Sequence, residues 1–250
     1  RTDNMFLNYE YDLKGIAVEG ENFLSVKIFS ATDYRERMDE HLPLRAIFDT
    51  GRIYLRKAQC HFGWDWAPNL PGAGMYLPVY VTIFDGLRVK SADVSADISG
   101  EVSLVVKTEG YSSGKCFIKA KIGDSELIGE IENDCAVIKT VIDNPKLWFP
   151  SGYGEAALYD YSVKIIKESG EECDEKKGKF GFRKIELVQS PLSDGRYSFY
   201  FTVNGRKIFA KGSNWVPISN MTGAIKDEAY EKLIKVAKDS GMNMLRVWGG

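Results

Sequence analysis

The chain has 250 residues, enough for one large domain or about two of ordinary size. Hydrophobic residues make up 44% of it, as in a globular protein with a core. The net charge of −2 includes no basic tract that would favour nucleic acid or an anionic membrane surface. No apolar run approaches the roughly 20 residues that span a bilayer. The four cysteines are scattered without zinc-ligand spacing, so we expect free thiols and no metal or other cofactor.

The two ends of the chain predict that it is part of a longer protein. It opens on Arg1-Thr2-Asp3 rather than on a methionine or a signal peptide, which leaves its localisation undetermined. It closes on Trp248-Gly249-Gly250, directly after an apolar segment, where a folded domain is not expected to stop.

Residues 1–86 are expected to form mainly strands. Alternating apolar and polar side chains predict strands at 21–30, 52–57 and 76–84. The segment 63–74, rich in aromatic residues, glycine and proline, predicts a structured loop. Asp85-Gly86 is a turn signal and a predicted domain boundary.

Residues 87–190 repeat short strand patterns with turn signals between them. The predicted strands are 89–98, 101–108, 115–122, 136–142, 158–167 and 179–188. The charged run 171–177 is expected to be a hairpin tip. Six or seven strands in about 100 residues, without a helix pattern, predict a β-sandwich of immunoglobulin type. The cysteine–tryptophan–cysteine framework of that fold is absent, so the prediction depends on the strand rhythm.

Residues 191–250 change to a mixed pattern. Two strands, 197–203 and 207–210, are joined by the hairpin signal Asn204-Gly205. A helix is predicted at 227–240, and the nearly continuous apolar run 242–248 predicts a strand buried on both faces. Strand, helix and buried strand form a βαβ unit, for which a (β/α)8 barrel beginning near residue 206 is the natural continuation.

The last predicted strand carries residues that could serve a site. Arg246 and Trp248 share one face and lie at the C-terminal end, where the active sites of (β/α)8 barrels are found. Asn214 and Trp215, just past the preceding strand, are expected to reach the same rim. The alternative is a structural arginine–carboxylate pair with a packing tryptophan, because a buried arginine is costly unless it is paired.

The Trp64-Asp65-Trp66 sequence is a second candidate. Aromatic rings can stack on the C–H faces of sugars, and a carboxylate can accept two hydrogen bonds from neighbouring hydroxyls. The alternative is a loop that closes the end of a sandwich or docks a neighbouring domain. Glycosidic hydrolysis also needs two carboxylates, about 5–5.5 Å apart for retention, and neither predicted barrel strand ends in an acid.

Several motifs occur along the chain in a fixed order. They are Arg56-Lys57-Ala58-Gln59, Phe62-Gly63-Trp64-Asp65-Trp66-Ala67-Pro68, Asn144-Pro145 with Leu147-Trp148, Gly181-Phe182-Arg183-Lys184, the segment 201–217, and Asn243-Met244-Leu245-Arg246-Val247-Trp248-Gly249-Gly250. In this order they resemble glycoside hydrolase family 2 in its β-mannosidase branch. No single motif decides the resemblance, which covers nearly the whole chain.

The resemblance implies a mainly β chain of three parts. Residues 1–86 would be the C-terminal part of a jelly-roll sugar-binding domain, 87–190 an immunoglobulin-like β-sandwich, and 191–250 the incomplete start of a (β/α)8 catalytic barrel. The implied reaction is retaining hydrolysis that releases terminal, non-reducing β-D-mannose. The implied partners are a β-mannoside oligosaccharide or glycan and the rest of the chain's own barrel, with no nucleic acid and no membrane.

The resemblance also assigns residues. Asp65 corresponds to an acid that holds hydroxyls of the terminal sugar, with Trp64 beside it. Arg246 and Trp248 correspond to residues that line the same subsite, as do Asn214 and Trp215 less closely. Both catalytic glutamates of the family would follow Gly250, so the chain is expected to contribute sugar-binding residues and to be inactive alone. It departs from the family in lacking those glutamates and the start of the jelly roll, and in having Ala67 where glycine is usual.

Other functions stay open at this point. An exo-β-glucosaminidase or another exo-glycosidase of the same family could share these domains. A stand-alone carbohydrate-binding or adhesion module is an alternative of another class. The incomplete βαβ unit argues against that module, because Leu233, Ile234 and Ala237 on the helix would form an exposed apolar patch.

Overall fold

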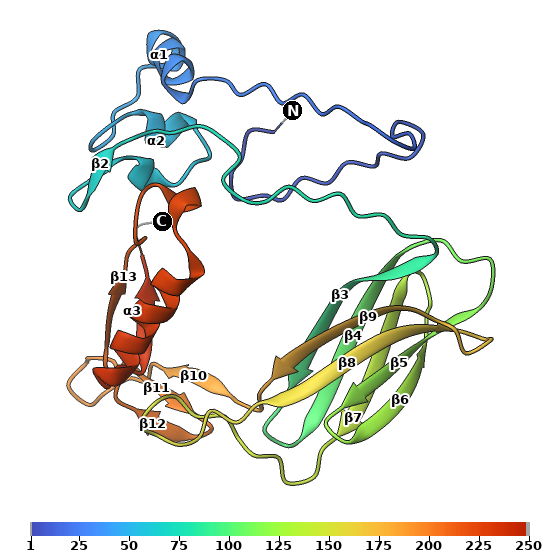
Figure 1. Ribbon diagram of the computed structural model, residues 1–250. Helices are drawn as coiled ribbons and strands as arrows, with labels where there is room; N and C mark the ends of the chain where they lie inside the picture. The colour runs from blue at the N-terminus through green and yellow to red at the C-terminus, as the bar shows by residue number, and fades with distance from the viewer. Residues whose placement is uncertain (1, 249–250) are drawn as a thin grey trace. The chain divides into compact units, whose positions relative to one another are not determined.

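The computed structural model describes residues 2–248 (Figure 1). The chain divides into two compact units. The first unit holds the residues up to Tyr80, the segment Ser213–Val236 and the residues from Leu245 onward. The second holds Val81–Gly212 and Ala237–Met244. The fold is mainly β, as the sequence predicts.

The N-terminal part of the first unit contains short elements rather than long strands. They are α1 (Ala31–His41), α2 (Gly51–Tyr54), the 3-10 helix η1 (Gln59–His61), β1 (Phe62–Trp64) and β2 (Ala67–Asn69). β1 and β2 pair antiparallel as a hairpin. The strands predicted at 21–30, 52–57 and 76–84 are therefore wrong.

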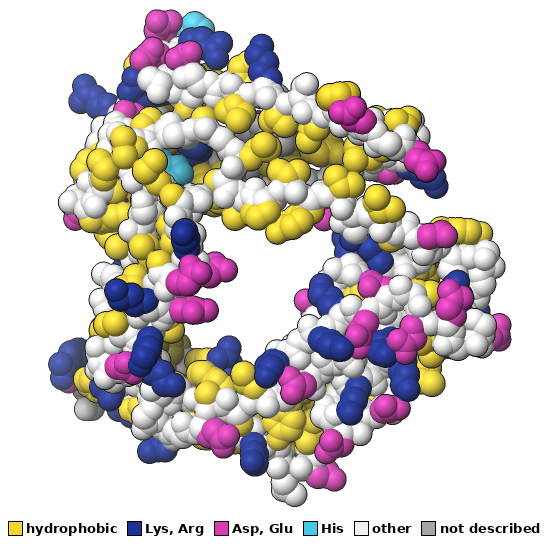
Figure 2. All heavy atoms as spheres, viewed as in Figure 1, with side chains coloured by type: hydrophobic (Ala, Val, Ile, Leu, Met, Phe, Trp, Pro, Cys, Tyr) yellow, Lys and Arg dark blue, Asp and Glu magenta, His cyan; other side chains and the backbone are white. Residues whose placement is uncertain are grey.

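The segments 21–30 and 76–84 are unpaired for a physical reason. A strand needs a neighbour to satisfy its backbone hydrogen bonds, and alternation predicts a face but not a partner. No other described segment pairs with them, and side chains such as Phe23 (89% exposed) and Tyr80 (79% exposed) face solvent. Figure 2 shows hydrophobic side chains spread over the surface of this unit.

The sequence did not predict α1 and α2, because each begins at a single capping hydrogen bond that apolar periodicity does not reveal. Ser30 caps α1, with its Oγ accepting a hydrogen bond from the Asp33 N–H at 3.1 Å, which is the Ser-x-x-Asp start of a helix. In α2, the Asp49 carboxylate accepts a hydrogen bond from Gly51 N–H at 2.8 Å and turns the chain into a helical turn. That turn replaces the beginning of the strand predicted at 52–57.

The second unit contains two antiparallel sheets that share one core. The first has the order β3-β4-β7 and the second the order β6-β5-β8-β9. Their bounds are β3 Leu87–Ala96, β4 Glu101–Gly110, β5 Cys116–Ile122, β6 Ser125–Glu130, β7 Cys135–Val141, β8 Tyr159–Lys167 and β9 Glu172–Phe180. Leu104, Ile118, Val163 and Ile165 are completely buried between the sheets, so alternating side chains build a sandwich-like core.

The charged run 171–177 belongs to a strand rather than to a hairpin tip. All of it except Glu171 lies within β9, the edge strand beside β8, where Lys164 pairs with Glu172 at 2.8 Å. Charged side chains are common on edge strands because they oppose pairing with other chains. The strand predicted at 179–188 is two elements: β9 ends at Phe180, and β10 (Ile185–Val188) joins another sheet.

β10 pairs with β11 (Tyr200–Val203), which pairs with β12 (Arg206–Ile208). The predicted hairpin at Asn204-Gly205 is confirmed. Both residues have positive φ values, 52° and 75°, as a tight two-residue hairpin turn requires.

The last part of the chain is a strand–helix–strand unit. β13 (Gly212–Trp215) and β14 (Met244–Val247) pair with each other, and η2 (Thr222–Ala224) and α3 (Asp227–Asp239) lie between them in sequence. The strands run parallel, because Asn243 N–H donates to Lys211 O and Trp248 N–H to Trp215 O. The first strand is therefore 212–215 rather than the predicted 207–210. Glycine at 212 permits this pairing, since a Cβ there would collide with the Met244 carbonyl oxygen.

β14 is not buried on both faces, contrary to the prediction. Val247 is 83% exposed, and Leu233 and Ile234 on α3 are 40% and 52% exposed. The sheet formed by β13 and β14 has no further described strand beside it.

In residues 2–248 no helix is both long and apolar enough to cross a membrane.

The sandwich core supplies a stability prediction. Ile165→Ala on β8 is expected to lower the free energy of unfolding by about 2–5 kcal/mol, because it opens a cavity at a completely buried position. Ile128→Ala on β6 removes the same atoms from a side chain that is 69% exposed, and is expected to cost less than about 1 kcal/mol. Urea unfolding of both variants checks this. Equal losses would contradict the core described here.

Candidate functional site

The Trp64-Asp65-Trp66 sequence forms the turn of the β1–β2 hairpin. Trp64 pairs with Ala67 across the turn, and Gly63 has a positive φ of 89°. The Asp65 carboxylate is exposed at the tip and has no hydrogen-bond or ion-pair partner among residues 2–248. Trp64 and Trp66 both pack on the small buried cluster of Ala58, Cys60 and Ala67, so the two tryptophans anchor the hairpin while Asp65 between them stays exposed.

The residues just before the hairpin anchor it. Cys60 and Phe62 are almost completely buried, and His61 is only 6% exposed. Neither ring nitrogen of His61 has a hydrogen-bond partner in the described chain. Burial, with a smaller contribution from the charge of Lys57, lowers the pKa of His61 and favours the neutral ring.

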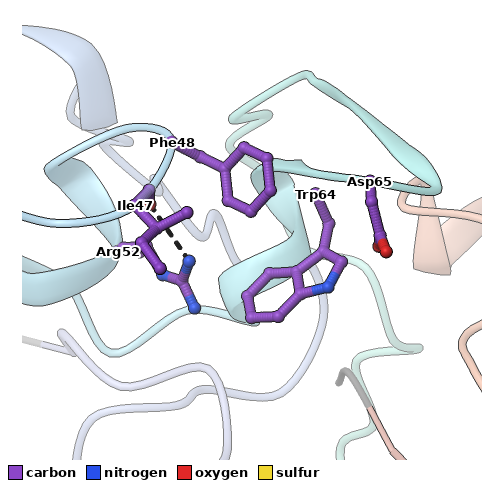
Figure 3. A pocket seen from close by; sticks show the side chains of 5 residues that line it. All are labelled: Ile47, Phe48, Arg52, Trp64 and Asp65. Atoms are coloured by element: carbon purple, nitrogen blue, oxygen red, sulfur yellow. Dashed lines mark hydrogen bonds between the residues drawn. The ribbon is translucent and has the colours of Figure 1, made fainter.

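Trp64 and Asp65 line an open depression of about 470 Å³ (Figure 3). Its other lining residues are Ile47, Phe48 and Arg52, from the segment that leads into α2 and from α2 itself. The indole of Trp64 lies between the Arg52 side chain and Asp65 in this view. The depression therefore combines aromatic surface, one cation and one free carboxylate.

Three of the four candidate residues near the C-terminus lie on the paired strands, and Trp248 directly follows β14. Asn214 and Trp215 lie within β13 rather than just past a strand, because β13 begins later than predicted. Arg246 Nη1 donates to Asn214 Oδ1 at 3.0 Å, so this arginine meets an amide oxygen and not the carboxylate of the structural alternative. The Trp248 N–H donates to Trp215 O at 2.9 Å.

Two contacts within the first unit connect the hairpin to this strand pair. The rings of Trp64 and Trp248 meet edge to face, with centroids 5.8 Å apart and an interplanar angle of 87°. Asn220, 9% exposed and located after β13, donates from Nδ2 to Pro68 O at 2.8 Å. The structure thus brings Trp64 against Trp248, whose backbone bonds to Trp215, while Arg246 bonds to Asn214 on the same strand pair.

Sequence reasoning missed Ile47, Phe48 and Arg52. They precede Trp64 by 12 to 17 positions, in a segment with no motif of its own. Only folding of the chain brings them beside the indole. Among the described residues, no group of three or more His, Cys, Asp or Glu side chains could hold a metal ion.

Comparison with known families gives matches over most of the chain. Residues 1–77 match the glycosyl hydrolase 2 galactose-binding domain-like family, and residues 79–183 match glycosyl hydrolases family 2. A curated relative, β-mannosidase B of Aspergillus fumigatus, is 35% identical over 266 residues. That alignment covers 99% of this chain but 31% of the relative, so the chain spans about a third of the relative's length.

Solved structures give the same result. The β-D-mannosidase from Dictyoglomus thermophilum is 35% identical, with a TM-score of 0.90 over 100% of this chain and 32% of its own. An exo-chitosanase from Amycolatopsis orientalis has a TM-score of 0.56 over 66% of this chain and 20% of its own. At 18% identity, the exo-chitosanase shares the fold alone.

His61 supplies a prediction on pH. A histidine whose folded pKa is lowered stabilises the fold fully above its unfolded pKa of about 6.5. That stabilisation is lost as the pH falls from there toward the folded pKa, because the unfolded chain binds the proton more readily. The free energy of unfolding of the first unit is expected to fall as the pH is lowered through about 6.5.

The chain has only one other histidine, His41 at the end of α1, which serves as the control. In urea unfolding at several pH values, His61→Gln is expected to flatten the dependence and His41→Gln to leave it unchanged. A dependence that survives His61→Gln in full would contradict the assignment.

Proposed function

Since the chain belongs to glycosyl hydrolase family 2, we propose that it supplies sugar-binding residues to a retaining exo-β-mannosidase. The substrate is a terminal, non-reducing β-D-mannose residue of an oligosaccharide or glycan. The 35% identity to a β-mannosidase B and to a β-D-mannosidase of known structure supports this substrate over that of other family members. Because the chain spans about a third of these relatives, the activity of the whole protein is part of the proposal.

The observation that carries the proposal is the contact between Trp64 and Trp248. It puts the free carboxylate of Asp65 on a hairpin that meets the C-terminal end of β14, the end at which barrel enzymes bind substrate. A carboxylate without a protein partner can accept hydrogen bonds from two neighbouring sugar hydroxyls. The rings of Trp64 and Trp248 supply apolar surface for the C–H face of the sugar.

The strand pair contributes the second part of the proposed subsite. The side chain of Arg246 is held by Asn214, and the backbone of Trp248 is held by its hydrogen bond to Trp215, so both residues are placed relative to β13. An oriented guanidinium can donate to sugar oxygens, which a carboxylate cannot do. Asp65 and Arg246 would thus recognise hydroxyls through opposite hydrogen-bonding roles.

The proposal assigns binding, and not bond cleavage, to these 250 residues. Retaining hydrolysis needs an acid and a nucleophile, both carboxylates, and the described strands β13 and β14 contain no acidic residue. We propose that both are glutamates on barrel strands that follow β14. The matching domain proposal is a jelly-roll part over 1–86, an immunoglobulin-like sandwich over 87–190 and a barrel start over 191–250.

Release of 4-nitrophenol from its β-D-mannoside tests the function, measured for the full-length protein and for residues 1–250 alone. The full-length protein is expected to turn over the mannoside, and residues 1–250 are expected to be inert. Preference for the β-D-glucosaminide would indicate an exo-β-glucosaminidase instead. Sugar binding without turnover by the full-length protein would indicate a carbohydrate-binding module.

Asp65 supplies a residue-level prediction. Asp65→Asn in the full-length protein is expected to lower kcat/KM for the mannoside about 10- to 150-fold, because it removes a charged acceptor worth about 1.5–3 kcal/mol. Asp124→Asn, an exposed aspartate in the turn between β5 and β6, is the matched control and should leave kcat/KM unchanged. Equal kcat/KM values for Asp65→Asn and the unaltered protein would refute the role of Asp65.

A further inference from the structure

We propose that Arg52 is a positioning residue that holds the indole of Trp64 in the orientation needed to bind sugar. This inference rests on the proposed function, because it concerns the same subsite. Arg52 was not among the residues that the sequence singled out. It acts on the substrate only through the tryptophan.

The guanidinium of Arg52 lies over the ring of Trp64, with Cζ 4.2 Å from the ring centroid (Figure 3). This is a cation–π contact, in which the positive charge is attracted to the electron-rich face of the indole. One face of Trp64 is thereby covered. A sugar that stacks on this indole has to use the opposite face.

Arg52 is itself fixed by two hydrogen bonds. Its Nη1 donates to Ile47 O at 3.1 Å, and its Nη2 donates to Gln59 Oε1 at 2.5 Å. These bonds hold both arms of a planar group, which a lysine ammonium cannot reproduce because it is a single point charge. The guanidinium is therefore an oriented support for the ring.

Phe48 completes the support and has an unusual backbone. Its ring centroid is 5.4 Å from that of Trp64 and 6.0 Å from Arg52 Cζ. Its φ is 67°, in the left-handed region that bulky side chains rarely adopt. Such strain persists only where neighbouring interactions enforce it, and it recurs at binding sites.

The residue after Phe48, Asp49, ties this segment to its neighbours. The Asp49 carboxylate accepts hydrogen bonds from Gly51 N–H at 2.8 Å and from Asn69 Nδ2 at 3.0 Å, and pairs with Arg35 at 2.9 Å. Because Asn69 lies on β2, the Phe48–Arg52 segment is tied to the hairpin that carries Trp64. The hydrogen bond between Asp49 and Asn69 therefore connects the segment that carries Phe48 and Arg52 to the hairpin that carries Trp64.

A double-mutant cycle in the full-length protein tests the inference. Arg52→Gln is expected to lower kcat/KM for 4-nitrophenyl β-D-mannoside about 2- to 30-fold, which is the range of a cation–π contact. The kcat/KM of Arg52→Lys should lie between those of Arg52→Gln and the unaltered protein, since lysine keeps the charge and loses the planar guanidinium. In a Trp64→Leu background, Arg52→Gln is expected to lower kcat/KM by less than about 2-fold, because the aromatic ring that Arg52 faces is already absent.

Arg183→Gln is the matched control. Arg183 Cζ lies 4.5 Å from the ring centroid of Trp148 in the second unit, so the substitution removes the same kind of contact from residues with no assigned role in the site. Its kcat/KM should equal that of the unaltered protein. If Arg52→Gln has the same effect with and without Trp64, or no effect in either background, the positioning role is wrong.

A second measurement separates this inference from the proposed function. Arg52→Gln is expected to change the near-ultraviolet circular dichroism of the tryptophans, and the change should vanish in the Trp64→Leu background. If the full-length protein releases no nitrophenol, the proposed function fails and the spectra alone decide the positioning of Trp64. An identical spectral change in both backgrounds, or none in either, would overturn it.

Discussion

The carboxylate of Asp49 joins three separate parts of the chain, and the geometry of the candidate site depends on it. It accepts hydrogen bonds from Arg35 on α1, from the backbone of Gly51 in α2 and from Asn69 on β2. Burial raises the pKa of Asp49, but the hydrogen bonds from Gly51, Asn69 and Arg35 and the charge of Arg35 outweigh that effect and leave it below its ordinary value. The group therefore stays charged at neutral pH. A neutral side chain would lose the pairing with Arg35 and weaken the link between the helices and the hairpin.

The interior of each unit is stabilised by a different kind of interaction. The sandwich of the second unit has a continuous apolar core, with residues such as Leu104, Ile118 and Ile165 completely buried. The first unit buries only small clusters, and many of its large apolar side chains face solvent. In the first unit, hydrogen bonds and aromatic contacts take the place of an extensive apolar core. Hydrogen bonds to Asp49, the cation–π contact of Arg52 and the edge contact of Trp64 with Trp248 specify positions that a sparse core leaves open. Such contacts are individually small, but each one constrains an angle as well as a distance.

The proposed subsite draws on residues that are far apart in the chain. Trp64 and Asp65 come from a hairpin, whereas Arg246 and Trp248 come from the end of a parallel strand pair. A binding site assembled in this way is sensitive to how each element is supported, because a small shift of one wall changes the fit of a rigid sugar ring. The support beneath Trp64 is accordingly as relevant to binding as the residues that touch the substrate. This explains how Arg52, which faces the indole, could affect recognition of a sugar that it does not contact.

Much of the architecture follows from local sequence. Alternation predicted most strands of the sandwich, the Asn204-Gly205 pair predicted the β11–β12 hairpin, and the helix pattern at 227–240 predicted α3. The Trp64-Asp65-Trp66 hairpin tip and the Arg246–Trp248 face also stood out from the sequence as candidate site residues. Tertiary structure decided the rest. Residues 21–30 alternate like a strand but have no described partner, and the apolar run of β14 is exposed because burial depends on neighbours that periodicity does not reveal. Phe48 and Arg52 carry no motif, and they join the site only because Asp49 folds their segment against the hairpin. A sequence pattern reports what a segment prefers, whereas contacts between distant segments depend on where the whole chain places them.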